Sequence, residues 1–369
     1  MTTVGVPTEV KAGEHRVAMT PDGVAELVHH GVEVFVQCGA GEGAALGDDE
    51  YAAAGATLVD GPEDVWSAAD VVCKVKEPQE EEVRFLRDGL VLFTYLHLAG
   101  YPEVAGWLRD AGVTGIGYET VQEADGSLPL LAPMSEIAGR MAPQIGAHHL
   151  ERGQGGRGVL LGGAPGVHPA RVVVVGAGNV GWNAAAIAAG MGAEVLLLDR
   201  DLERLRWVDQ FHQGRVLTLA SNRAAVARAV AAADLLVGAV LVAGGRAPTV
   251  VSEEMVESMR CGSVLIDVAV DQGGCIATTR ETTHDDPTFV AHDVIHYAVG
   301  NIPGAVPHTS TFALTNATLP YVEALATAPS PLEACRADQA LARGVNTHAG
   351  AVTHPAVAAS LGVEHVPLV

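Results

Sequence analysis

The chain has 369 residues, 49% of them hydrophobic and 18% charged, which excludes a disordered chain and indicates two domains. Its net charge of −22 opposes contact with nucleic-acid phosphates and with anionic membranes. Aromatic residues make up only 4%, so the cores must be built from Val, Leu, Ile and Ala, a composition typical of buried parallel sheets.

The first 120 residues alternate short apolar runs with segments of helical character. This alternation predicts a mostly parallel sheet with helices on both faces. A helix should begin after Thr20, whose hydroxyl can cap it, with Pro21 and Asp22 in its first turn. The expected strands are residues 3–9, 32–39, 56–60, 70–78, 90–98 and 113–121.

The stretch "PMSEIAGRMAPQIGAHHL" predicts an amphipathic helix, because Ile137, Met141 and Ile145 recur every four residues. We expect Ser135 to cap this helix and Pro143 to kink or shorten it. The run "RGQGGRGVLLGGAPGVHP" that follows is rich in Gly and Pro and predicts a loop.

A second series of strands begins with "VVVVGAGNVGWNAAAIAAGMGAEVLLLDRD", residues 172–201, and continues in residues 214–221, 233–242 and 262–271. A long helix should start near residue 305, and the tail beyond it has no strand pattern and should return to the first domain. We therefore predict an α/β fold with two doubly wound parallel-sheet domains. A Rossmann domain, residues 135–304, is inserted in a discontinuous domain formed by residues 1–134 and 305–369.

The five cysteines lack CxxC spacing and leave one without a partner, which favours a reducing compartment over a disulfide framework and gives no support for a metal site. The amino terminus lacks the basic flank and apolar run of a signal peptide. No uncharged apolar run approaches the roughly 20 residues that span a bilayer. The expectation is a cytoplasmic protein.

Three glycines, Gly176, Gly178 and Gly181, form a GxGxxG motif between a run of four valines and an Ala-rich helix. In a dinucleotide-binding turn these glycines allow the tight turn, the approach of pyrophosphate and close helix–strand packing. Asp199 ends the next apolar run and could accept hydrogen bonds from ribose hydroxyls, which favours NAD over NADP. Arg200 and Arg204 nearby weaken that preference.

Charged residues interrupt apolar runs at places where ligands of parallel sheets bind, beyond the carboxyl ends of strands. Lys74 and Lys76 lie in "CKVKEP", His97 in "TYLHL", Asp271 at the end of "VLIDVAVD" and Arg16 in the loop after the first strand. An arginine can hold a carboxylate, a lysine can polarise a carbonyl and an imidazole can exchange a proton.

Each of these residues also has a structural interpretation. Arg16 could pair with Glu9 or Glu14 on the surface, the lysines could be solvated, His97 could be a hydrogen-bonded core residue and Asp271 could cap the next turn. Their occurrence together, beside a nucleotide-binding pattern, favours a catalytic site.

These motifs resemble the alanine dehydrogenase family over about residues 1–355. The matching stretches include "VGVPTEVKAGEHRVAMTPDGVAEL", "KVKEP", "TYLHLA", "LPLLAPMSEIAGR", "DVAVDQGGC" and "VPHTSTFALTNATLPYV". The resemblance implies a reversible, NAD-dependent oxidative deamination of L-alanine to pyruvate and ammonium by a homohexamer.

The resemblance also implies roles for single residues. Arg16 and Lys76 would bind the substrate, His97 would be the general acid and base, and Asp271 the second catalytic residue. Met134 would lie near the cofactor. The implied cofactor-binding residues are Ser135, Gly176, Gly178, Asn179, Val180, Gly181, Asp199, Arg204, Ser221, Val240, Leu241, Val268, Ala269, Val270, Asp271, Arg280, Val299, Gly300, Asn301 and Ile302.

Four positions depart from the residues expected of the family, namely Asn179, Trp182, Gly300 and His308. His308 could shift affinity for an anion, and Gly300 could loosen the loop beneath the nicotinamide. Two alternatives therefore stay open. One is a dehydrogenase for another small or longer L-amino acid, and the other is an NAD-binding component without turnover, like that of transhydrogenase.

Overall fold

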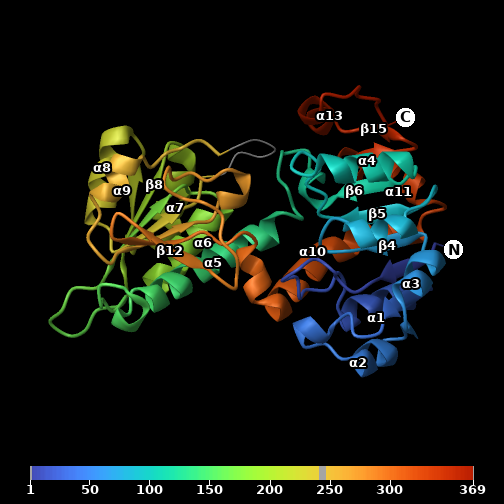
Figure 1. Ribbon diagram of the computed structural model, residues 1–369, viewed down its shortest axis with the longest axis horizontal. Coiled ribbons are helices and arrows are strands. Elements are labelled where there is room, and N and C mark those ends of the chain that lie inside the picture. The colour runs from blue at the N-terminus through green and yellow to red at the C-terminus, as the bar shows by residue number, and fades with distance from the viewer. Residues whose placement is uncertain (1, 241–246, 369) are drawn as a thin grey trace. The chain divides into compact units, whose positions relative to one another are not determined.

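The structure is a computed structural model that describes residues 2–240 and 247–368. It divides into two compact units. The first contains the residues up to Met134 and those from Val306 onward, and the second contains Ser135–Ala305. Figure 1 shows the first unit in blue to teal and again in red, because the end of the chain folds back onto its beginning.

The first unit is built on a sheet with the strand order β15-β14-β6-β5-β4-β1-β2-β3. Its parallel strands are β1 (Val4–Val6), β2 (Val34–Gln37), β3 (Thr57–Val59), β4 (Val71–Cys73), β5 (Val91–Thr94) and β6 (Thr114–Gly117). All six lie within the predicted runs. Two antiparallel strands, β14 (Val345–His348) and β15 (Ala351–Val352), complete the sheet.

The prediction that the tail has no strand is wrong. Strand β14 reads Val-Asn-Thr-His and shows no apolar alternation. It is held by tertiary contacts instead, since the Gly115 N–H donates to Thr347 Oγ1 at 3.2 Å and that hydroxyl donates to the Val113 carbonyl at 3.1 Å. Side-chain hydroxyls thus replace apolar contacts in fixing this strand.

Helix α1 (Pro21–His29) begins as predicted, with Thr20 Oγ1 accepting from the Gly23 N–H at 3.2 Å and Pro21 in its first turn. The long helix expected near residue 305 is α10 (Pro307–Thr327). The remaining helices of this unit are α2 (Asp48–Ala53), α3 (Pro62–Ala68), α4 (Pro102–Asp110), α11 (Pro331–Ala337), α12 (Gln339–Gly344) and α13 (Pro355–Leu361).

Helix α10 also fixes the loop that carries Arg16. Thr311 Oγ1 accepts from the Val17 N–H at 3.2 Å, and Thr315 Oγ1 accepts from the Thr20 N–H at 3.1 Å. Two residues nearly 300 positions away in sequence therefore hold the backbone beside this arginine.

The second unit contains a sheet with the order β12-β13-β11-β10-β7-β8-β9. All strands are parallel except β12 at one edge. The α/β prediction is confirmed, but both sheets are mixed rather than fully parallel. The strands are β7 (Arg171–Val175), β8 (Glu194–Asp199), β9 (Val216–Ala220), β10 (Leu235–Gly238), β11 (Val264–Asp267), β12 (Thr288–Ala291) and β13 (Val294–Tyr297).

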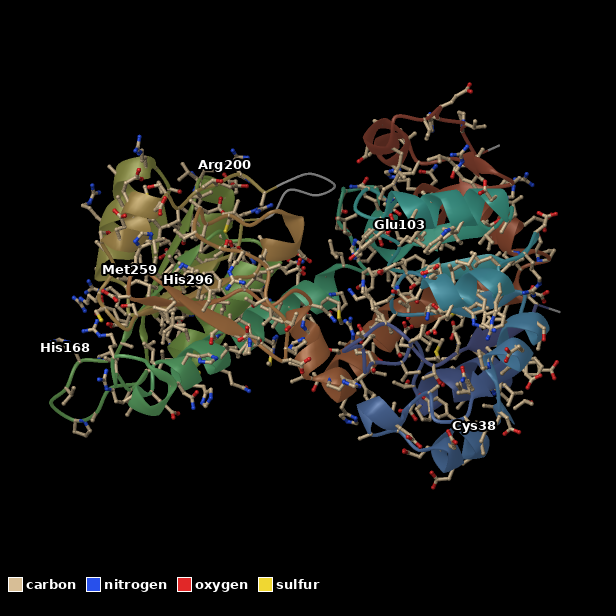
Figure 2. The ribbon with its side chains drawn as sticks, viewed as in Figure 1. Cys38, Glu103, His168, Arg200, Met259 and His296 are labelled. Atoms are coloured by element: carbon tan, nitrogen blue, oxygen red, sulfur yellow. The ribbon has the colours of Figure 1, made fainter. Side chains whose placement is uncertain are left out.

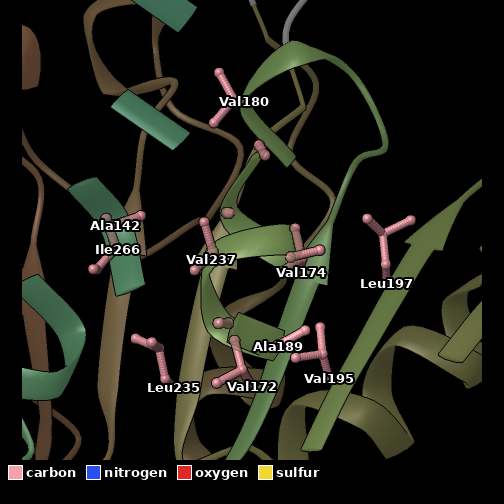
Figure 3. Packing of buried hydrophobic residues seen from close by; sticks show 14 of the residues in the cluster. Ala142, Val172, Val174, Val180, Ala189, Val195, Leu197, Leu235, Val237 and Ile266 are labelled. Carbon is pink, nitrogen blue, oxygen red and sulfur yellow. The ribbon is translucent and has the colours of Figure 1, made fainter. Parts of the chain in front are cut away.

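Both faces of this second sheet are buried, and Figure 3 shows one of them. Val172 and Val174 point to one core, whereas Val173 and Val175 point to the other. This explains the run of consecutive valines, because a strand covered on both faces needs no polar alternation. The helices are α5 (Ala132–His149), α6 (Asn179–Gly190), α7 (Leu202–His212), α8 (Arg223–Ala232) and α9 (Glu253–Glu257).

The expected cap of α5 is wrong, and Pro143 does not shorten the helix. The helix begins at Ala132, three residues before Ser135, so Ser135 does not cap it, and Pro133 is suited to its first turn. The helix also continues past Pro143 to His149. Ala142 is fully buried, and Ile145 packs on the core, which offsets the hydrogen bond that a proline removes.

The glycine turn after β7 has the geometry that its sequence predicts. Gly176 has φ +109°, and a Cβ there would overlap the carbonyl oxygen of Ala239. A Cβ on Gly181, in the first turn of α6, would overlap the carbonyl oxygen of Gly176. Backbone atoms therefore exclude any side chain at these two positions.

We expect Gly181→Ala to lower the free energy of unfolding by ~1–3 kcal/mol, because the clash is with backbone and forces a shift. Gly190→Ala is the matched control, since a Cβ at this last residue of α6 meets no atom of residues 2–240 and 247–368 within 4 Å. Replacing a helical glycine there should preserve or slightly raise stability. Chemical denaturation of both variants tests this, and equal midpoints would contradict it.

Candidate active site

Charged residues of the first unit gather at the carboxyl ends of adjacent parallel strands. In the order β6-β5-β4-β1, Arg16 lies in the loop after β1, Lys76 follows β4 by three residues and His97 follows β5 by three residues. The first unit therefore brings together the two predicted substrate-binding residues and the predicted general base.

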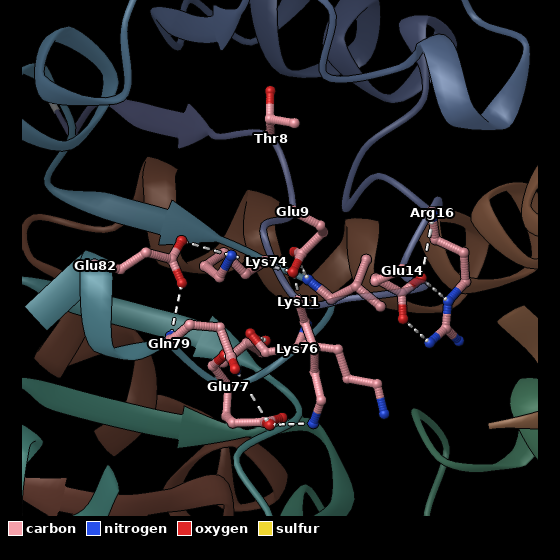
Figure 4. A network of polar contacts seen from close by, with 12 residues as sticks. Thr8, Glu9, Lys11, Glu14, Arg16, Lys74, Lys76, Glu77, Gln79 and Glu82 are labelled. Atoms are coloured by element: carbon pink, nitrogen blue, oxygen red, sulfur yellow. Dashed lines mark hydrogen bonds and ion pairs between the residues drawn. The ribbon is translucent and has the colours of Figure 1, made fainter. Parts of the chain in front are cut away.

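Arg16 is buried and forms a two-pronged ion pair with Glu14. Its Nε lies 2.7 Å from Glu14 Oε1 and its Nη2 lies 2.6 Å from Glu14 Oε2 (Figure 4). Both side chains are at most 2% exposed, so the predicted partner is correct but its surface location is wrong. The third nitrogen, Nη1, contacts Met134 Sδ at 3.0 Å.

The pairing controls the ionisation of Glu14. Burial alone would raise the pKa of its carboxyl, but hydrogen bonds and attraction from Arg16 dominate and hold the pKa at about 2. Glu14 is a site residue that sequence reasoning treated only as a surface partner, although its spacing from Arg16 was visible.

Lys74 and Lys76 are two residues apart, but their ammonium groups have different surroundings. Lys74 is 0% exposed, and its Nζ lies 3.1 Å from Glu9 Oε2 and 2.8 Å from Glu82 Oε1. Burial would lower the pKa of Lys74, yet the two carboxylates raise it. Strand β4 ends at Cys73, so the two-residue period of a strand does not govern these positions.

The ammonium of Lys76 has no hydrogen-bond or ion-pair partner among residues 2–240 and 247–368, and no dashed line reaches it in Figure 4. Its backbone is held, because the Thr94 hydroxyl donates to its carbonyl at 2.9 Å. Burial, followed by repulsion from Arg16 and Lys11, lowers the pKa of Lys76. A half-buried cation beside Arg16 that pairs with no carboxylate among the described residues is suited to binding an anionic or carbonyl group.

His97 is half-buried and its imidazole stacks on Tyr95, with ring centroids 5.7 Å apart and an angle of 3° between the planes. The Tyr95 hydroxyl donates to the Leu130 carbonyl at 2.6 Å, which fixes the ring under the imidazole. Sequence reasoning missed Tyr95, and its place two residues before His97 at a strand end was the available signal.

In the second unit, the predicted cofactor residues also collect at carboxyl ends of parallel strands. The N-cap of α6 is Gly178, which has no side chain to accept the first N–H groups of the helix. Of the residues that the structure describes, a Cβ there would meet Arg204 Nη1 alone, at 3.7 Å. This open helix N-terminus fits a pyrophosphate. Asn179 is exposed in the first turn, whereas Val180 is buried.

Asp199 ends β8, as predicted. Its Oδ2 accepts from the Ala177 N–H at 2.6 Å and its Oδ1 from the Asp201 N–H at 2.8 Å, so the carboxylate is tied to the glycine turn. Arg204 pairs instead with Asp201 at 3.6 Å, and Arg200 lies exposed at the surface (Figure 2). A fixed carboxylate at this place suits ribose hydroxyls and repels a 2′-phosphate.

The loop after β11 is organised by Asp267. This buried carboxylate accepts from the N–H groups of Ala269, Cys275 and Ile276 at 3.0–3.1 Å and from the Thr279 hydroxyl at 2.8 Å. It turns the chain away from the strand, so Asp271 does not end β11 as expected. It lies four residues later, exposed, in a short 3-10 helix of residues Val270–Gln272.

The other implied cofactor residues have these locations. Ser135 is in α5, Ser221 follows β9, Val240 follows β10 and Arg280 places its guanidinium 4.3 Å from the centre of the Phe289 ring. Leu241 lies outside the described residues. After β13 come Val299, Gly300, Asn301 and Ile302, of which Asn301 has φ +65°.

Three of the four departures have local roles. Trp182 packs edge-on against Trp207 at 5.0 Å and Phe211 at 5.6 Å. His308 Nδ1 lies 2.8 Å from the Ala44 carbonyl oxygen, which ties α10 to the segment after β2. A Cβ at Gly300 would overlap the Glu281 carboxylate, so glycine makes room for that side chain.

The second α/β unit has an open glycine turn with Asp199 placed to bind a ribose. The first α/β unit carries Arg16, Lys76 and His97 at the carboxyl ends of its strands. Together these features define the class of nucleotide-dependent dehydrogenases. The chain belongs to the alanine dehydrogenase/PNT family. Its residues 5–138 match the family's N-terminal domain and residues 142–355 match the C-terminal domain. Residues 306–355 thus match the C-terminal domain but fold with the first unit.

Similar proteins cover almost the whole chain. An alanine dehydrogenase of Mycobacterium tuberculosis is 55% identical over 360 residues, 98% of this chain and 97% of that protein. One of Bacillus subtilis is 52% identical over 365 residues, 99% and 96% of the two chains.

Solved structures agree. An L-alanine dehydrogenase superposes with a TM-score of 0.95 at 50% identity, covering 98% of this chain and 99% of that one. A transhydrogenase from Sinorhizobium meliloti superposes with a TM-score of 0.82 at 26% identity, covering 96% and 99%. Among the described residues, no helix has both the length and the apolar character that a bilayer crossing requires.

We expect Lys74→Ala to lower the stability of the protein and Lys76→Ala to lower its activity. The first leaves two buried carboxylates without a cation and should lower the free energy of unfolding by ~3–5 kcal/mol. The second removes an unpaired ammonium, so stability should change by less than ~0.5 kcal/mol. Its kcat/KM should instead fall ~10–100-fold, the loss of one charge-assisted hydrogen bond. Denaturation and steady-state kinetics measure both, and identical behaviour of the two variants would refute the assignment.

The Glu14–Arg16 pair predicts a pH dependence. The folded-state pKa of Glu14 is lowered from 4.5 to about 2, so its contribution is complete above 4.5 and disappears as the pH falls towards 2. Its size is on the order of 3 kcal/mol. The difference in unfolding free energy between the wild type and Glu14→Gln should be constant from pH 7 to 5 and shrink below 4.5. A difference that vanishes already at pH 5 to 6 would show that the carboxyl titrates normally.

Proposed function

We propose that this chain oxidises L-alanine with NAD and water to pyruvate, ammonium, NADH and a proton, and that the reaction is reversible. It is an NAD-dependent L-alanine dehydrogenase. The observation that carries the residue assignments is the convergence of Arg16, Lys76 and His97 at the ends of three adjacent strands. The fixed Asp199 beside the open glycine turn supports NAD as the cofactor.

Binding of the substrate is assigned to two cations. Arg16, oriented by Glu14, holds the alanine carboxylate, and Lys76 donates to the oxygen that forms on the former α-carbon. Lys11 and Lys74 are already paired with Glu77 and with Glu9 and Glu82. The ammonium of Lys76, which has no partner in the described part of the chain, is therefore the cation available for this task.

NAD, when bound, accepts the hydride from the α-carbon. The α-ammonium first loses the proton that the overall reaction releases. His97 then takes up a proton from the water that adds to the resulting imine carbon and returns it to the nitrogen as the carbon–nitrogen bond breaks, and the departing ammonia takes the hydroxyl proton and leaves as ammonium. Lys76 stabilises the negative charge on oxygen as the carbonyl forms. We assign Asp271 to steering water and ammonia. Burial against Tyr95 keeps the imidazole in one orientation throughout.

The cofactor would be held by the second unit, residues 135–304, and the amino acid by residues 1–134 with 305–369. The GxGxxG turn would bind pyrophosphate through the N-terminus of α6 and Asp199 would bind the adenosine ribose. We assign the loops after β10, β11 and β13 to the nicotinamide side. We further propose a homohexamer, from the family, and a cytoplasmic location, since all five cysteines are free.

The two alternative functions, a nucleotide-binding component and a dehydrogenase for another amino acid, make predictions that differ from those of an alanine dehydrogenase. A nucleotide-binding component without turnover has no need for a half-buried ammonium that lies beside a second cation and pairs with none of the described carboxylates. An enzyme for a longer amino acid should favour that substrate over alanine. Both alternatives are tested by one assay, the absorbance of NADH formed when NAD is mixed with each L-amino acid. Alanine should give the highest kcat/KM, and activity with none of them would favour the binding component.

Replacing the proposed base should affect turnover more than binding. We expect His97→Ala to lower kcat ~10²–10⁴-fold, the usual range for general acid–base catalysis. NADH binding, followed by its fluorescence, should remain at the wild-type level because the substitution is in the other unit. Turnover equal to the wild type would remove His97 from the mechanism.

A further inference from the structure

The backbone of His97 adopts a conformation that is uncommon for a residue with a side chain. Its φ is +46°, in the left-handed region where Cβ crowds the carbonyl oxygen. Such a conformation persists only where its surroundings impose it, and it occurs often at functional sites. The direction of the imidazole depends on this backbone, because Cα and Cβ set where the side chain starts.

One carboxylate holds the amide side of this turn. Glu119 Oε1 accepts from the His97 N–H at 2.7 Å, and its Oε2 accepts from the Leu96 N–H at 3.2 Å. Both carboxylate oxygens of Glu119 therefore accept hydrogen bonds from consecutive backbone amides just after β5. Hydrogen bonds to a charged acceptor are about twice as strong as those between neutral groups.

The carbonyl side of the same residue is held by the start of the next helix. The His97 carbonyl accepts from the Gly100 N–H at 2.8 Å and from the Tyr101 N–H at 3.2 Å. With its N–H fixed by Glu119 and its carbonyl fixed by this turn, the His97 backbone is held from both ends. Only the hydrogen bonds to Glu119 come from a side chain, so they are the ones that a substitution can remove.

The neighbourhood of Glu119 keeps its carboxylate in place. Glu119 follows the next strand, β6, in the 3-10 turn Tyr118–Thr120. A Cβ on Gly117 would lie 3.1 Å from Glu119 Oε1 and 2.5 Å from Asn346 Nδ2, so glycine leaves the space that the carboxylate occupies. The Thr120 hydroxyl lies 3.0 Å from the Gly117 carbonyl oxygen and closes the turn.

We propose that Glu119 is a positioning residue of the dehydrogenase, which acts by holding the left-handed backbone of His97 so that the imidazole points at the reacting proton. This rests on the role of His97 under the proposed function. Glu119 acts on kcat rather than on substrate affinity, because its carboxylate binds the backbone of Leu96 and His97 after β5, whereas the proposed substrate-binding residues Arg16 and Lys76 follow β1 and β4.

The test is Glu119→Gln, assayed with NAD and L-alanine. Glutamine keeps one acceptor oxygen but turns an NH₂ group towards the second backbone N–H, so one hydrogen bond becomes a repulsive contact. We expect kcat to fall ~10²-fold, as a misplacement of about 1 Å costs in a preorganised site, while the KM for alanine changes little. Glu119→Asp retains the charge and both oxygens and should recover part of the loss.

Glu123→Gln is the matched control. Glu123 follows the same turn, is exposed and accepts from the Tyr321 hydroxyl at 2.8 Å, so the same substitution should leave kcat at the wild-type value. A kcat of Glu119→Gln equal to that of this control would overturn the proposal. A rise in KM with unchanged kcat would also overturn it, since it would show a binding role.

Two further measurements keep the outcomes distinct. If the wild type oxidises alanine and His97→Ala does not, but Glu119→Gln remains active, only the positioning role fails. If the wild type has no alanine activity, the proposed function itself fails. Should Glu119→Gln not fold, hydrogen exchange of the wild-type enzyme decides, because the Leu96 and His97 amides should be protected, and rapid exchange at both would refute the proposal.

Discussion

The structure of the first unit depends on the pairing of buried charge. Four carboxylates, from Glu9, Glu14, Glu77 and Glu82, face four cations, from Lys11, Arg16, Lys74 and Lys76, at one end of a sheet (Figure 4). An ion removed from water without a counter-charge costs several kcal/mol, so the fold must supply partners. Because Lys74 uses two carboxylates, the arrangement leaves one cation over, and that cation is Lys76. The chemistry of the site follows from this distribution, since the ammonium without a carboxylate is the one that an incoming substrate oxygen can engage.

In the second unit, backbone groups rather than charged side chains provide the electrostatic field at the proposed ligand site. Its proposed phosphate site has a glycine N-cap and an open helix N-terminus, so the positive field comes from N–H groups. Two carboxylates of this unit, those of Asp199 and Asp267, accept from backbone amides and thereby shape the turn after β7 and the loop after β11. In both units, therefore, acids that do not themselves react fix the backbone from which the reactive groups project.

Much of this arrangement could be predicted from the sequence. The apolar runs located six parallel strands of the first sheet and the first five of the second, and GxGxxG with Asp199 predicted the nucleotide turn, because these features depend on neighbours in sequence. The antiparallel strands β12, β14 and β15 were not predicted, since edge pairing and hydroxyl contacts leave little local signal. The start of α5 and its passage through Pro143 likewise depend on tertiary packing.

The same distinction separates the site residues that the sequence revealed from those that it did not. Arg16, Lys76 and His97 are found by chemistry and by position at strand ends. Glu14 and Tyr95 lie two residues from Arg16 and His97, so their spacing was a local signal, whereas Glu119 is found only when it is known which strands are neighbours. β6 lies next to β5 in the sheet, and this adjacency brings a glutamate 22 positions later in sequence onto the amides of Leu96 and His97. A residue type at a strand end therefore suggests which reaction is possible, whereas strand order decides which groups orient it. Here the backbone of His97, which follows β5, is held by the carboxylate of Glu119, which follows the neighbouring strand β6. The left-handed conformation of His97 is therefore where strand order affects the orientation of the proposed catalytic base.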